Sequence, residues 1–143
     1  MIDHFNLPVS DLETSRRFYE LALAPLGLKI LMTYGDAIGF GIDTWAFGIV
    51  LAALPFPRLH LAFRAGSTEE VDRFFRAALE AGGKSNGPPG IRAAYDRSYY
   101  AAFAPDPDGH NIEAVWRNAA MPDTSRSTGI ESASTTSFSR ATE

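Results

Sequence analysis

Apolar positions along residues 1–117 alternate between two spacings, one typical of strands and one typical of helices. A short extended run at 2–7 precedes Ser10-Asp11-Leu12-Glu13, and a second run at 59–63 precedes Ser67-Thr68-Glu69-Glu70. In each tetrad a Ser is followed three residues later by a Glu, which is the pattern of a capping box. Apolar residues then recur every three or four positions. The pattern predicts two amphipathic helices, which end at 25–27 and 82–83.

Three strands are predicted after each helix. They cover 28–34, 37–41 and 45–51 in the first half, and 91–95, 98–104 and 111–116 in the second, with turns at 42–44 and 105–109. Glu13 and Glu70 are 57 residues apart, as are Phe18 and Phe75, which indicates an internal duplication. We therefore predict an α+β domain of two tandem βαβββ modules, residues 1–53 and 58–117.

Composition limits the functions that the chain can have. Of its 143 residues 45% are apolar, the net charge is −4, and there is no cysteine. These values favour a globular protein and argue against nucleic-acid binding, disulfides and thiol chemistry. We find no targeting signal and no membrane span, and expect a cytoplasmic protein. Residues 118–143 contain 11 Ser or Thr among 26 residues and are predicted to form a disordered tail.

The most distinctive segments are His4 with Val9-Ser10-Asp11-Leu12, the run His60-Leu61-Ala62-Phe63, and the closing 106–115, DPDGHNIEAV. With the repeated βαβββ pattern, they make the chain resemble the glyoxalase/bleomycin-resistance/dioxygenase superfamily, also called the vicinal oxygen chelate superfamily. The resemblance covers residues 1–117. It implies a cupped, eight-stranded mixed sheet around a central cleft, with the helices outside and a divalent metal often bound inside. It also implies a homodimer, because relatives commonly pair modules between chains.

Strand alternation places His4, His60 and Glu113 on the faces opposite the more apolar side chains. Two imidazoles and one carboxylate form a facial set that holds Fe²⁺, Mn²⁺, Ni²⁺ or Zn²⁺ with open positions for a substrate. The resemblance places the superfamily's metal ligands on the same strands. Each residue taken singly also has an ordinary interpretation, as a half-buried histidine or a solvated glutamate. His110 lies in the turn before the last strand, and we expect it to face solvent.

Other residues are candidates for the chemistry around this site. Tyr100 is the candidate catalytic acid, and a loop at 86–90 could cover the cleft. The strand 45–51 contains no acid, whereas glyoxalase I carries a carboxylate ligand there, which argues against the usual glyoxalase reaction. The candidate substrate-binding residues are Arg92, Tyr95, Tyr99, Asn86, Trp45 and Phe47, and the cations available for a phosphonate are Arg92, Arg58 and Lys84.

Two functions remain open at this point. The first is a metal-dependent enzyme that acts on a small oxygen-rich or aromatic molecule, by dioxygenase-like chemistry or by thiol-transferase or lyase-like chemistry. The second is a non-catalytic protein that binds a small molecule or a drug, as the bleomycin-resistance relatives do. The apolar strand at 45–51 could line a ligand groove in that case.

Overall fold

The computed structural model describes residues 1–120; the predicted tail from 121 onward lies outside the described residues. The first module contains β1 (Phe5–Val9), α1 (Leu12–Leu23), the short 3₁₀ helix η1 (Ala24–Leu26), β2 (Lys29–Tyr34), β3 (Ala37–Gly41) and β4 (Trp45–Leu51). The second contains β5 (His60–Arg64), α2 (Thr68–Glu80), β6 (Gly90–Ile91), β7 (Tyr99–Pro105) and β8 (Asn111–Arg117). The predicted α+β fold of two βαβββ modules is confirmed.

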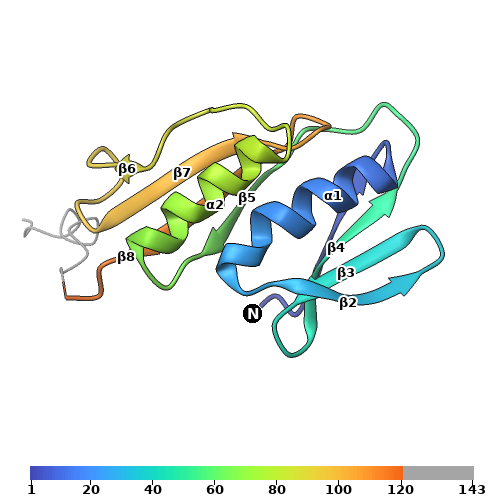
Figure 1. Cartoon of the computed structure of the whole chain (residues 1–143), viewed down its shortest axis with the longest axis horizontal. Coiled ribbons are helices and arrows are strands. Elements are labelled where there is room, and N and C mark those ends of the chain that lie inside the picture. The colour runs from blue at the N-terminus through green and yellow to red at the C-terminus, as the bar shows by residue number, and fades with distance from the viewer. Residues whose placement is uncertain (121–143) are drawn as a thin grey trace, which may run out of the picture.

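The eight strands form two four-stranded mixed sheets, in the orders β1-β4-β3-β2 and β5-β8-β7-β6. In each sheet the first strand of the module pairs in parallel with the last, and the other pairs are antiparallel. Figure 1 shows α1 and α2 side by side, each lying over the sheet of its own module. The face of each sheet turned away from its helix is called the helix-free face below. No helix within residues 1–120 is long and apolar enough to cross a bilayer.

The helix starts match the predicted positions, but one cap differs. Ser67 caps α2 by accepting a hydrogen bond from the Glu70 N–H at 3.2 Å. In α1 the cap is Asp11, whose side chain accepts from the Thr14 N–H at 2.8 Å. Ser10 instead contacts Asp108 of the other module, with its N–H donating at 3.0 Å. The first tetrad is therefore not a capping box, because its Ser is used between the modules.

The hydrophobic core lies between the helices and the sheets and runs through both modules. Phe47 of β4 and Phe63 of β5 meet edge to face, with ring centroids 5.1 Å apart, and so join the two halves. Strand alternation sends every second residue into this core, including Leu7 and Val9 of β1 and Ile112 and Ala114 of β8, all fully buried. The residues between them are left for the helix-free faces.

Candidate functional site

The strand register gathers polar side chains on the helix-free face of the second sheet. Glu113 of β8 pairs with Ala62 of β5 on one side and with Phe103 of β7 on the other. Its neighbours Ile112 and Ala114 are buried in the core, so Glu113 must point the opposite way. The same alternation places His60 and Tyr99 on this face beside it.

Glu113 is a buried carboxylate that has two hydrogen-bond partners. Its side chain is 2% exposed, and its Oε2 lies 2.9 Å from the Nε2 of His60. Its Oε1 accepts a hydrogen bond from the hydroxyl of Tyr99. Burying a charge is costly unless the charge is paired, and these two contacts supply that compensation. The side chain of His60 is 51% exposed, so the pair is reached from solvent through the imidazole.

An amide chain orients His60. The side-chain N–H of Asn86 donates to Oδ1 of Asn111 at 3.0 Å, and Nδ2 of Asn111 lies 2.8 Å from Nδ1 of His60. An amide nitrogen only donates, so Nδ1 of His60 accepts and carries no proton. The neutral imidazole then carries its proton on Nε2, which donates to Glu113. Asn111 was not among the predicted site residues, although it lies two residues before Glu113 and shares its face.

Tyr99 is held as a neutral donor. Burial raises its pKa to about 12, and the hydrogen bond to the carboxylate of Glu113 acts in the same direction. The guanidinium of Arg117 lies 4.4 Å from the centre of the Tyr99 ring. The exposed ring of Tyr95 meets it edge-on at 5.4 Å. Of the two predicted substrate-binding tyrosines, Tyr99 therefore contacts Glu113 directly through its hydroxyl, and Tyr95 packs against Tyr99.

His4 lies apart from this cluster. Its Nδ1 is 2.7 Å from a carboxylate oxygen of Asp3, and its ring centre is 4.4 Å from that of Trp45. His4 and Trp45 line a pocket of about 540 Å³ at the first module, together with Asp43. Within residues 1–120, no group of three His, Asp or Glu side chains is arranged to hold one metal ion. The described residues thus bring His60 and Glu113 together without His4, and they form no three-ligand metal site.

Two residues predicted for the cleft lie elsewhere. Tyr100 follows Tyr99 on β7 and so points to the other face, where its hydroxyl donates to Asp72 of α2 at 2.8 Å. Tyr100 therefore does not lie beside Glu113 as expected, and the hydroxyl that contacts Glu113 is that of Tyr99. Phe47 is 3% exposed and lies in the core, so it does not line a ligand groove.

The expected lid at 86–90 is bound to β7 of the second sheet by backbone hydrogen bonds. The N–H of Asn86 donates to the Phe103 carbonyl at 3.0 Å, and the N–H of Phe103 donates to the Gly87 carbonyl at 2.9 Å. These bonds continue the pairing of β7 beyond the short β6. Arg92 fastens the same segment, because its guanidinium donates to the carbonyls of Pro88 and Ala101. Its guanidinium carbon also lies 5.2 Å from the centre of the Phe103 ring. Arg92 therefore holds backbone rather than offering an unused cation.

His110 is fully buried, which contradicts the expectation that it faces solvent. Its Nδ1 accepts from the Leu59 N–H at 3.0 Å, and its Nε2 donates to the Pro8 carbonyl at 2.8 Å. The ring stacks on Phe56 at 5.6 Å. His110 thus links β1 of the first module to the start of β5 in the second. Sequence alternation could not reveal this, because the residue lies in a turn.

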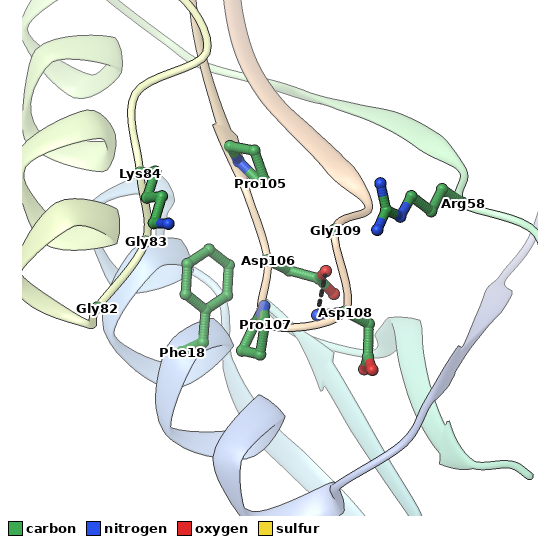
Figure 2. A pocket seen from close by; sticks show the side chains of 10 residues that line it. All are labelled: Phe18, Arg58, Gly82, Gly83, Lys84, Pro105, Asp106, Pro107, Asp108 and Gly109. Atoms are coloured by element: carbon green, nitrogen blue, oxygen red, sulfur yellow. Dashed lines mark hydrogen bonds between the residues drawn. The ribbon is translucent and has the colours of Figure 1, made fainter. Parts of the chain in front are cut away.

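The same turn forms one wall of a pocket of about 470 Å³ (Figure 2). Arg58 and Lys84, two of the cations considered for a phosphonate, line it together with Asp106 and Asp108. Asp106 is tied to the fold by the Tyr19 hydroxyl, which donates at 2.6 Å. Burial raises the pKa of Asp106 above its usual value, and it also raises that of Tyr19. None of the residues around Glu113 lines this pocket, so Arg58 and Lys84 do not serve that site.

Comparison with known proteins agrees with this architecture. The Bacillus subtilis (strain 168) protein YqjT is 34% identical over 122 residues, which cover 78% of this chain and 95% of YqjT. A glyoxalase/bleomycin resistance protein from Albidiferax ferrireducens T118 is 31% identical, with a TM-score of 0.71 over 80% of this chain and 97% of that structure. Oxidase ChaP-H2 is 26% identical, with a TM-score of 0.63 over 82% of this chain and 94% of that structure. The family model for the Glyoxalase/Bleomycin resistance protein/Dioxygenase superfamily matches residues 1–114, and the chain belongs to that superfamily.

Proposed function

We propose that this protein is a metal-dependent enzyme that acts on a small oxygen-rich or aromatic molecule, with its site completed between two copies of the chain. The observation that carries the proposal is the buried carboxylate of Glu113 on a helix-free face, in contact with His60 and Tyr99. A carboxylate in that position adds nothing to the hydrophobic core, and its desolvation is costly. Burial of this kind is common where the group has a chemical role.

The proposed ligands are His60 and Glu113 of one chain and His4 of a second copy. His4 is exposed, and within the described residues its Nε2 forms no hydrogen bond, so a neighbouring chain can reach it. Two histidines and one carboxylate suit Fe²⁺, Mn²⁺, Ni²⁺ or Zn²⁺ and leave positions open. Superfamily members commonly use such divalent ions. When bound, the ion would polarise substrate oxygens.

The chain's own residues then have separate roles. Asn111 lies 2.8 Å from Nδ1 of His60 and orients the ring. When Nε2 of His60 binds an ion, the ring proton would have to lie on Nδ1, and the Asn111 amide would turn to accept it through Oδ1. Tyr99 keeps its proton at neutral pH, because its pKa is raised to about 12. Its single hydroxyl hydrogen is donated to Glu113 in this structure, and it would turn to a substrate oxygen that gains negative charge once Glu113 binds the ion. The similarity to a protein named an oxidase favours oxygen chemistry over thiol transfer.

The first test is metal loading of untagged protein. Purified chain is incubated with each of the four ions, and bound metal and thermal midpoint are then measured. We expect stoichiometric metal and a raised midpoint in the wild type. His4→Ala, His60→Ala and Glu113→Gln should each lose most of the metal. Glu80→Gln, at an exposed position on α2, is the matched control and should keep it. Wild-type protein that binds none of the four ions would refute the proposal.

A mixing experiment tests whether the site lies between chains. The His4→Ala chain keeps His60 and Glu113, whereas the Glu113→Gln chain keeps His4. If one copy completes the site of the other, refolding the two variants together should partly restore metal binding that neither shows alone. If the three ligands act within one chain, the mixture should bind no more metal than its components. Sedimentation equilibrium checks the dimer on which the experiment depends.

A non-catalytic binding protein is the second candidate function. It is favoured by the lack of a three-ligand cluster within the described part of one chain. The discriminating measurement is a thermal-shift comparison of metal ions with bleomycin-type glycopeptides. A shift with the drug and none with any metal would select this candidate.

A further inference from the structure

Two arginines share the helix-free face with Glu113. Arg64 of β5 pairs with Val115 of β8, and Tyr99 of β7 pairs with Arg117. Paired residues point to the same side of a sheet, and side chains two or four positions apart on a strand share a face. Arg64 and Arg117 therefore lie on the Glu113 side of the sheet, beyond it toward the strand ends. Neither arginine was among the predicted site residues, although both follow the strand alternation that places Glu113 on this face.

A pocket of about 210 Å³ opens between these two arginines at the ends of β5 and β8. Its lining contains no acidic residue and consists of Arg64, Ala65, Gly66, Val115, Trp116 and Arg117. Within residues 1–120, no ion pair includes Arg64 or Arg117, and both side chains are exposed. The carboxylate of Glu70 approaches the rim but accepts from the Gly66 N–H at 2.6 Å. The pocket therefore presents two guanidinium groups without a compensating carboxylate in its lining.

Arg117 connects this pocket with the candidate site. Its guanidinium carbon lies 4.4 Å from the centre of the Tyr99 ring, and the Tyr99 hydroxyl contacts Glu113. A guanidinium stacked on an aromatic ring is oriented, so less freedom is lost when it binds an anion. Arg92 does not compete for this role, because backbone carbonyls and the Phe103 ring hold its guanidinium.

We infer that Arg64 and Arg117 form a subsite for an oxyanion, a carboxylate or a phosphate, carried by the substrate. The inference rests on the proposed function for the reacting end of that substrate, which would lie at Glu113, His60 and Tyr99. The planar guanidinium fork binds both oxyanions through paired N–H donors. The exposed ring of Tyr95 stands at the edge of Tyr99 and favours a substrate with an aromatic part next to its anionic group. The substrate class is therefore a small organic acid or phosphate.

Binding of two probes tests the subsite without any need for activity. Benzoate and inorganic phosphate are titrated separately into metal-free full-length protein, and the Gly66 and Val115 amide signals are followed by two-dimensional NMR. We expect at least one probe to move these signals, and its affinity to fall by about tenfold or more in Arg64→Gln and in Arg117→Gln. Arg117→Lys should restore part of the loss through its charge. Arg73→Gln, at an exposed position on α2, is the control and should bind as the wild type does.

The outcomes separate the two proposals. If neither probe moves the pocket signals, or if both arginine variants bind as the wild type does, the subsite is refuted, whatever the metal experiments give. If an arginine-dependent probe binds to a protein that takes up no metal, the subsite stands and the proposed function fails. Benzoate binding alone identifies a carboxylate site, and phosphate binding alone identifies a phosphate site. If circular dichroism shows that Arg117→Gln does not fold, the probe affinity of Arg64→Gln alone tests the subsite, because this variant keeps Arg117 against the Tyr99 ring.

Discussion

Replacing His110 by Phe tests the role of the turn that links the two modules. The substitution keeps a ring that can stack on Phe56, but it removes both nitrogen atoms. The Leu59 N–H loses its acceptor, Nδ1 of His110, now 3.0 Å away, and the Pro8 carbonyl loses its donor, Nε2, now 2.8 Å away. The ring of His110 is fully buried, whereas Leu59 and Pro8 are half-buried. An unsatisfied polar group costs about 1–3 kcal/mol when it is fully buried, so for two half-buried groups we expect a loss of about 2–4 kcal/mol in the free energy of unfolding.

A loss of that size is large compared with the total stability of a typical domain, which is about 5–15 kcal/mol. The assay is urea-induced unfolding at one fixed protein concentration, with a chelator present. Tyr34→Phe is the control, because Tyr34 is 83% exposed, and it should change the free energy by no more than about 0.5 kcal/mol. If His110→Phe unfolds at the same urea concentration as the control, the linking role of His110 is refuted.

Three further substitutions test individual contacts. The pKa of Tyr99 is raised from 10.0 to about 12, so its contribution to stability is present below pH 10.0 and lost as the pH rises through 12. In an absorbance titration Tyr99→Phe should therefore lose a phenolate component near pH 12, and loss of one near pH 10.0 would contradict the assignment. Tyr100→Phe removes the hydrogen bond to Asp72 and should lower the free energy of unfolding by about 1 kcal/mol without changing the metal content. Loss of metal in this variant would show that Tyr100 does contribute to the site. Ser67→Ala removes the cap of α2 and should lower the free energy of unfolding, measured in urea, by about 1 kcal/mol. An unchanged free energy would show that this cap does not stabilise the helix.

The local signals in the sequence were sufficient for the fold. Capping residues, apolar spacing and turn motifs are set by neighbours within a few positions, which is why both helices and the duplicated βαβββ order could be predicted. The predicted strand at 91–95 is the main local error. Only Gly90–Ile91 pairs there, because the chain turns at Arg92, whose carbonyl accepts from the N–H groups of Tyr95 and Asp96.

For the site, the sequence determined which side of each strand a residue occupies, since side chains alternate with a period of two. That was enough to place His60 and Glu113 on one face. Only the tertiary structure decided which of these residues meet, because contacts between strands depend on register and on how the modules pack. It replaced Tyr100 by Tyr99, separated His4 from the pair and buried His110. The contacts of Tyr99 with Glu113 and of His110 with Pro8 join residues that are far apart in the chain, and the spacing of residues along the chain does not show which distant residues come together.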